Sequence, residues 1–136
     1  MSQEKKVEVF SANQAYEIFV GLDEGLSKEA VAIYKKAKFT PQQMRVLREA
    51  LHKIPASFVK LYAISGLEPE KMQLIFDGIE AGFSFEEIGL YEYGFDVPQM
   101  REIFNGLKSG LTFSKVEAFA KREFSAEKMR EMRLAI

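Results

Sequence analysis

The sequence predicts an all-α fold, a right-handed α-solenoid-like array of about nine short helices built from four α-hairpin repeats of 28–29 residues plus a terminal helix. Three observations predict it. An aromatic residue or Leu, called the marker below, recurs at near-constant spacing, apolar residues follow each marker at helical intervals, and glycines end three of the predicted helices. A period of about 20 to 50 residues is typical of repeat architectures.

The markers define the repeats. They are Phe10, Phe39, Leu67, Phe95 and Phe124, which stand 29, 28, 28 and 29 residues apart. They divide one predicted domain, residues 1–136, into repeats one to four and a half repeat five: residues 10–38, 39–66, 67–94, 95–123 and 124–136. Positions are counted from the marker, so that position 5 is Met in repeats two to five and Ala15 in repeat one.

Each marker comes just before a predicted helix start. In four repeats the next residue is a good N-cap: Ser11, Thr40, Asp96 and Ser125. In three of them a Gln follows three residues later and completes a capping box: Gln14, Gln43 and Gln99. The marker and position 5 then have the spacing of a hydrophobic staple. We therefore expect the Met residues at position 5 to be part of the core.

Apolar residues at positions 5, 8 and 12 form the buried stripe of this first helix. The helix is expected to stop at Gly25, Gly82 or Gly110, each followed by an apolar residue, as in a C′ glycine motif. Repeat two has Ile54 and Pro55 instead. A second, shorter helix begins at Ser27, Ser84 or Thr112.

Glycines also recur inside the first helix, at position 11 of three repeats: Gly21, Gly78 and Gly106. Glycine costs about 1 kcal/mol relative to Ala in a helix interior. Recurrence at one position therefore indicates a packing reason, and we expect two helix backbones to approach closely there.

Three segments carry a resemblance to known repeats: KMQLIFDGIEAGF (residues 71–83), QMREIFNGLKSGL (residues 99–111) and MREMRLAI (residues 129–136). They resemble short helical repeats of the form F-x-x-x-Q-M-x-E-I-R-x-G-L-x-x-G-L, found in tandem in poorly characterised proteins of bacterial mobile elements and phages. The likeness covers residues 10–136 and implies an α-hairpin array with no catalytic residue. Phe76 and Phe104 replace the consensus Arg.

Position 9 varies most informatively, because it alternates between aromatic and cationic residues: Phe19, Arg48, Phe76, Phe104 and Arg133. Exposed aromatic and Arg side chains are enriched at interface hot spots. These five residues and Arg45 are the candidate partner-binding residues. The alternative is that position 9 packs against the neighbouring repeat.

His52 is the only histidine, and the chain has no cysteine. Disulfides, thiolate metal sites and a cysteine nucleophile are therefore excluded. The residues near His52 supply neither a triad nor a metal site, so we expect it to interact with the dipole at the end of its helix. No phosphate-binding or calcium-binding motif occurs. The sequence predicts no catalytic residue, no metal site, no cofactor and a protein that is not an enzyme.

Charge is distributed unevenly, although the formal net charge is −1. Residues 39–66 carry four cations and one Glu, or +3, whereas residues 67–94 carry one Lys and seven acidic residues, or −6. Patches of opposite sign can steer a charged partner or favour head-to-tail self-association, so a homodimer is an alternative. A solvated outer face is the simpler explanation.

The N-terminal residues are charged and contain no apolar leader, and no stretch approaches the roughly 18 apolar residues of a membrane span. We therefore expect a cytoplasmic protein with no membrane partner.

We predict a protein-binding helical-repeat module, a phage or mobile-element factor that inhibits or adapts a host protein. The alternative is a nucleic-acid-binding repeat, because helical repeats can read RNA one base per repeat. Its cations would come from repeats two, four and five: Arg45, Arg48, Lys60, Arg101, Lys108, Lys121, Arg122, Lys128, Arg130 and Arg133. The −6 of repeat three interrupts a continuous basic groove.

Overall fold

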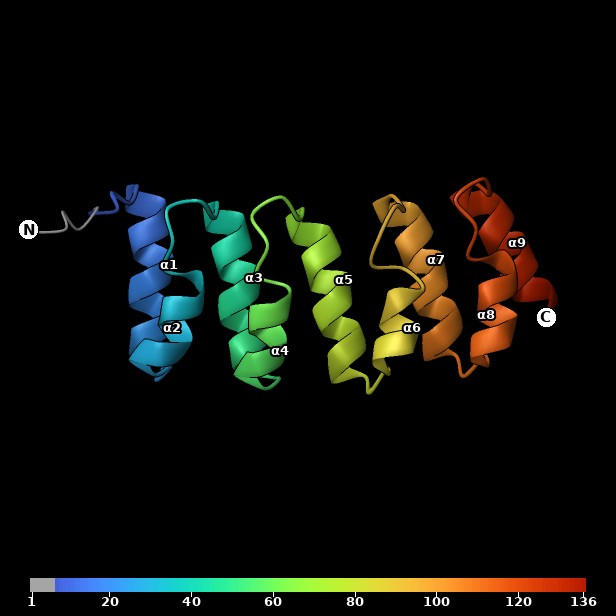
Figure 1. Cartoon of the computed structure of the whole chain (residues 1–136), viewed down its shortest axis with the longest axis horizontal. Coiled ribbons are helices and arrows are strands. Elements are labelled where there is room, and N and C mark those ends of the chain that lie inside the picture. The colour runs from blue at the N-terminus through green and yellow to red at the C-terminus, as the bar shows by residue number, and fades with distance from the viewer. Residues whose placement is uncertain (1–6) are drawn as a thin grey trace, which may run out of the picture. The chain divides into compact units, whose positions relative to one another are not determined.

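In a computed structural model that describes residues 7–136, the described residues form nine α-helices and no β-strand, which confirms the all-α class (Figure 1). The first helices of the repeats are α1 (Ala12–Asp23), α3 (Pro41–Leu51), α5 (Pro69–Glu80), α7 (Val97–Lys108) and α9 (Ala126–Ala135). The second helices are α2 (Lys28–Tyr34), α4 (Ala56–Leu61), α6 (Phe85–Gly89) and α8 (Phe113–Phe119). Most of the charged N-terminal segment, residues 1–6, lies outside the described residues.

The contacts between residues divide the chain into an N-terminal unit, Met1–Pro69, and a C-terminal unit, Glu70–Ile136. In the N-terminal unit α1 packs along α3, and α2 lies against α1, α3 and α4. In the C-terminal unit α7 packs along α9, and α8 lies against both. The single domain and the right-handed solenoid stay predictions.

The predicted helix signals are confirmed at both ends of the first helices. In α1 the Ser11 hydroxyl accepts a bond from the Gln14 N–H at 3.2 Å, while the Gln14 side chain accepts one from the Ser11 N–H at 2.8 Å. The same capping box begins α3 and α7. Gly25 has a φ of 94°, a conformation that favours glycine, and the following N–H donates to the Gly21 carbonyl at 3.0 Å.

The capping Gln has a second role that the capping pattern does not predict. The Gln14 Nε2 group also donates to the carbonyls of Ala37 and Phe39, at 3.1 and 2.7 Å. Gln43 and Gln99 make the corresponding pairs of bonds to the link that leads into the next repeat. One side chain therefore caps its own helix and holds the chain just before the next one. We call this arrangement the Gln clamp.

The core contains the predicted stripe in repeats two to four, where its residues are buried or half-buried. In repeat one the prediction was wrong for Ala15 and Leu22, which are exposed because no helix of the described N-terminal unit covers that side of α1. The Met residues at position 5 are at most 1% exposed, as expected for staple partners: Met44, Met72, Met100 and Met129. In repeat two, Ile54 is buried and Pro55 is the N-cap of α4, with no side-chain bond to the helix.

The glycines at position 11 were expected to face a second helix backbone, and this prediction was wrong: they face aromatic side chains. A Cβ atom on Gly21 would overlap the Tyr34 hydroxyl, which donates to the Glu17 carbonyl at 2.8 Å. Gly78 accommodates Tyr91 and Gly106 accommodates Phe119 in the same way. The glycine therefore makes room for an aromatic ring at the end of the second helix or just after it, rather than for a second backbone.

Candidate functional site

Two of the candidate residues at position 9 are arginines, one buried and one half-buried, that bond to carboxylates of their own units. Arg48 is 9% exposed, and its guanidinium donates to Glu17 at 3.0 Å and to Glu24 at 2.7 Å. Arg133 donates to Glu102 at 3.0 Å. Glu17 and Glu102 both occupy position 7 of the preceding repeat. Each arginine thus joins its own repeat to the preceding one by bonding to the Glu carboxylate at position 7 of that repeat.

These bonds outweigh the cost of burying charge. Burial acts to lower the pKa of the Arg48 guanidinium, but the bonds to Glu17 and Glu24 raise that pKa above its ordinary value. The bond from Arg48 in turn lowers the pKa of the Glu24 carboxyl group. Arg48 is therefore a charged structural side chain, already occupied by two partners.

The two inner phenylalanines at position 9 are also packed. Phe76 is buried, and the Phe104 ring lies 5.3 Å from the Phe83 ring and 6.4 Å from the Tyr91 ring, measured between centroids. The Tyr91 hydroxyl donates to the carbonyl of Leu74, the position 7 residue of repeat three, at 3.0 Å. Within each unit, the residue at position 9 is therefore of a kind that suits position 7 of the preceding repeat: Arg48 and Arg133 bond to Glu17 and Glu102, and the sequence sets Phe104 after Leu74.

Arg45 and His52 lie at the surface of α3. Arg45 is exposed and forms an ion pair with Glu49, one helical turn away, at 3.2 Å. His52 is the C-cap residue of α3, at the helix end where the sequence places it, and its Nε2 atom lies 3.2 Å from a Glu24 oxygen.

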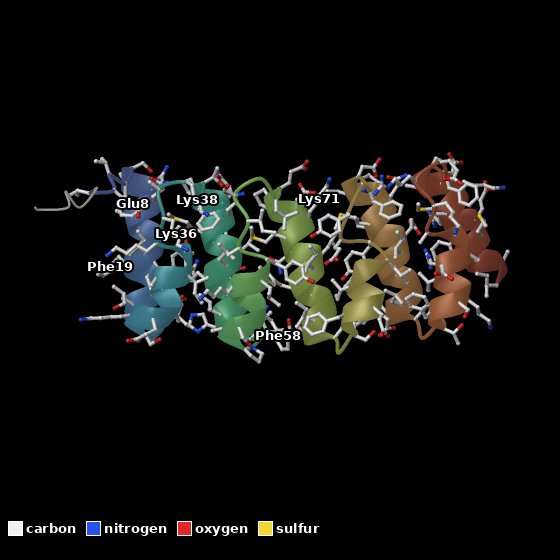
Figure 2. All side chains as sticks on the ribbon, in the orientation of Figure 1. Glu8, Phe19, Lys36, Lys38, Phe58 and Lys71 are labelled. Carbon is white, nitrogen blue, oxygen red and sulfur yellow. The ribbon has the colours of Figure 1, made fainter. Side chains whose placement is uncertain are left out.

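Phe19 differs from the other residues at position 9 because it is 64% exposed. Its side chain leaves α1 on the side away from α3 (Figure 2). Tyr16 and Leu22 are 63% and 45% exposed, and Ala15 is exposed as well. These four residues have the spacing of one helical face. We call them the α1 apolar face: Ala15, Tyr16, Phe19 and Leu22.

Three of the four positions that form this face, 5, 9 and 12, are buried or half-buried in α3 and α7, whereas position 6 is exposed there as Arg45 and Arg101. In α3, Met44 at position 5 and Arg48 at position 9 are buried, and Arg48 reaches α1 through its bond to Glu17. In α7, Met100 at position 5 and Leu107 at position 12 are buried. The α1 apolar face is thus a helix-packing face on which no other helix of the described N-terminal unit lies.

Ala15 and Leu22 were expected in the buried stripe, and Tyr16 carried no expectation from the sequence. It occupies position 6, which holds polar or cationic residues in the other repeats: Arg45, Gln73, Arg101 and Arg130. An aromatic residue at a position that is otherwise polar is a signal of special use, and comparison of the repeats at position 6 would have found it.

A hollow beside the face is lined by residues of α1 and α2: Leu22, Lys28, Val31, Ala32 and Lys35. Leu22 belongs to both the face and the hollow. Lys28 and Lys35 are exposed, and they are the two charged residues of the lining. The apolar floor therefore has a cationic edge.

The structure of residues 7–136 bears on metal binding, membrane spanning and nucleic-acid binding. No group of three or more His, Asp or Glu residues in this range is placed to hold a metal ion. No helix in the same range has the length and apolar character needed to cross a bilayer. Of the cations considered for nucleic-acid binding, Arg48 and Arg133 are bonded to buried or half-buried carboxylates.

Comparison of the chain with protein-family models, with curated proteins and with solved structures returned no match.

Proposed function

We propose that this chain is a non-enzymatic protein-binding module and that the α1 apolar face is the surface that contacts the partner. The observation that carries the proposal is the 64% exposure of Phe19, at a position that is buried in α3 and half-buried in α7, beside Tyr16, which is 63% exposed. Aromatic side chains are preferred anchors in protein interfaces. The resemblance to repeats of phages and mobile elements favours a factor that inhibits or adapts a host protein.

Of the original candidates, Phe19 keeps this role in the proposal. Arg48, Phe76, Phe104 and Arg133 pack within the chain, and Arg45 lies on the surface of α3. Nucleic-acid binding stays the alternative. Two of its ten candidate cations, Arg48 and Arg133, are already paired with Glu residues of the chain.

The test is a capture experiment with a matched control. The tagged chain is used to capture proteins from an extract of the cells that produce it, as wild type, as Phe19→Asp and as Tyr93→Asp. Tyr93 is 68% exposed and lies in the other unit, so both substitutions introduce a charge at an exposed aromatic position. We expect proteins that wild type and Tyr93→Asp retain and that Phe19→Asp loses, quantified by mass spectrometry.

Two results would count against the proposal. Equal recovery with Phe19→Asp would remove the α1 apolar face from the binding site. A shift of single- or double-stranded oligonucleotides at low salt, with no protein captured, would favour the nucleic-acid alternative.

A further inference from the structure

The α1 apolar face has the geometry of a surface that receives a helix. In the N-terminal unit, the corresponding face of α3 receives α1, and both helices begin at the same end of the unit (Figure 1). Position 9 marks this contact, because Arg48 of α3 bonds to Glu17 of α1. A helix that lay on α1 as α1 lies on α3 would cover Ala15, Phe19 and Leu22.

The chemistry at position 9 indicates which side chain such a helix presents. Where position 9 is Arg, as in Arg48 and Arg133, a Glu faces it. Where position 9 is Phe104, its ring packs on the rings of Phe83 and Tyr91, although Asp77, Glu80 and Lys108 line a hollow beside it. Phe19 has no charge to offer, and a carboxylate buried against it would lose its hydration without a partner. The incoming side chain is therefore apolar.

A second copy of the chain fits this requirement poorly. The helix at the other end of the repeats is α9, and its position 7 residue is Glu131. Glu131 is exposed, 4.0 Å from Lys128. Head-to-tail stacking in the register of the repeats would place this carboxylate opposite Phe19. Head-to-tail stacking of two copies is therefore disfavoured.

The edge of the face indicates the charge of the partner. Lys28 is the first residue of α2 and Lys35 is its C-cap, and both line the hollow that Leu22 shares with Val31 and Ala32. Two cations beside an apolar floor favour acidic residues at the edge of a bound helix.

We propose that the α1 apolar face binds an amphipathic α-helix of a partner protein, which lies along α1, presents an apolar side chain to Phe19 and carries acidic residues beside Lys28 and Lys35. This inference rests on the proposed function and specifies the chemistry of its partner. The mode is helix-in-groove recognition, in which anchors recur every three or four residues.

The probes are two fluorescent synthetic peptides of about 18 residues, or roughly five helical turns. Both carry the same Leu stripe at helical spacing, flanked by Glu in one peptide and by Lys in the other. Fluorescence anisotropy measures their affinity for the full chain. We expect the Glu-flanked peptide to bind at least about tenfold more tightly, and Phe19→Asp to weaken it about 30-fold, the effect of a hot-spot residue.

Charge reversal gives the sharper readout. The double variant Lys28→Glu, Lys35→Glu is expected to prefer the Lys-flanked peptide, while Tyr93→Asp retains the wild-type preference. Equal affinity for the two peptides, or no binding of either, would overturn the acidic-helix assignment. Sedimentation that shows a wild-type dimer, dissociated by Phe19→Asp, would overturn it in favour of a second copy.

The two proposals can fail separately. Phe19-dependent capture of a cellular protein, without peptide discrimination, retains the protein-binding function and rejects the acidic helix. Loss of both results rejects both proposals.

Discussion

A glycine and an aromatic ring form a matched pair inside three of the repeats. The ring stands at position 24: Tyr34, Tyr91 and Phe119 follow Gly21, Gly78 and Gly106. In repeat two both members differ together, with Ala50 at position 11 and Ala63 at position 24. A larger residue at position 11 thus accompanies a smaller one at position 24, the direction that close packing favours.

Substitution of this glycine is expected to depend on the hydroxyl group of the ring. Gly21→Ala gains about 1 kcal/mol of helix propensity but forces the Tyr34 hydroxyl aside, and overpacking costs about 1–3 kcal/mol. We expect a net loss of about 1 kcal/mol in the free energy of unfolding, measured by urea denaturation. In a Tyr34→Phe background the nearest atom is Cζ at 3.2 Å, and the same substitution should become neutral or stabilising.

The control for this prediction is Gly89→Ala in α6, where an added Cβ meets nothing within 4 Å. This variant should be at least as stable as wild type. A Gly21→Ala cost that persists unchanged without the hydroxyl would show that the ring is not its cause.

Tyr34 also predicts a pH dependence at the alkaline end. Burial raises its pKa from 10.0 to about 12. Because the folded state holds this proton more tightly than the unfolded state, its contribution to stability is complete below pH 10 and is lost as pH rises toward 12. We expect the urea midpoint to fall across this window, and to fall less in Tyr34→Phe. Equal slopes for the two proteins would assign the alkaline transition to other groups.

At the scale of helices, the Gln clamp connects one helix to the start of the next. Gln43 accepts the Thr40 N–H and donates to the carbonyls of Ser65 and Leu67, each at 2.8 Å. A single amide side chain can do both because it carries an acceptor and two donors.

A carboxylate would separate the two functions of the clamp. Gln43→Glu retains the acceptor, as Glu87 does in the capping box of α6, but cannot donate to the two carbonyls. We expect a loss of about 1–3 kcal/mol in the free energy of unfolding, since polar groups are left without a partner. The neighbouring Gln42→Glu, at an exposed position, is the control and should change stability little. Equal effects of the two substitutions would contradict the clamp.

The contact between α1 and α3 should tolerate apolar residues in place of both Arg48 and Glu17, but not in place of Arg48 alone. Arg48→Phe leaves the Glu17 carboxylate, which is 9% exposed, without its partner, and we expect a loss of about 3 kcal/mol. Adding Glu17→Leu recreates the apolar combination of Leu74 and Phe104 and should restore stability to within about 1 kcal/mol of wild type. The measurement is urea denaturation followed by circular dichroism.

The exposed pair of Arg45 and Glu49 provides the comparison, because Arg45→Ala should cost less than about 0.5 kcal/mol. If the double variant Arg48→Phe, Glu17→Leu does not regain stability, the ion pair itself is required and an apolar pair cannot replace it.

At the scale of the molecule, the charge contrast between repeats two and three is smaller than the sequence indicates. Glu17 and Glu24 of repeat one bond to Arg48, so the +3 of residues 39–66 becomes +1 when these two carboxylates are counted with it. We therefore expect a monomer of 15.5 kDa in sedimentation experiments, both at physiological salt and at low salt on the order of 20 mM. A dimer that dissociates as salt is added would restore head-to-tail association as the explanation of the charge pattern.

The parts of the fold that the sequence predicted depend on residues close together in the chain. Capping by Ser11 and Gln14, and the stop at Gly25, each involve neighbours within a few positions. The bond from Arg48 to Glu17 spans 31 residues, and the exposure of Phe19 depends on which helix covers it. Neither feature can be predicted from residues close together in the chain. The ion pair could have been expected from the repeat pattern, because Glu at position 7 is followed by Arg at position 9 of the next repeat in two places.

The match between positions 7 and 9 also restricts how such a chain can lengthen by tandem duplication. A copied repeat must place its own position 9 against its own position 7. Repeat one would set Phe19 against Glu17, repeat two Arg48 against Val46, and repeat four Phe104 against Glu102. Only repeat three, with Leu74 and Phe76, is compatible with itself. Insertion of a second copy of residues 67–94 is therefore the duplication that leaves every new junction chemically matched.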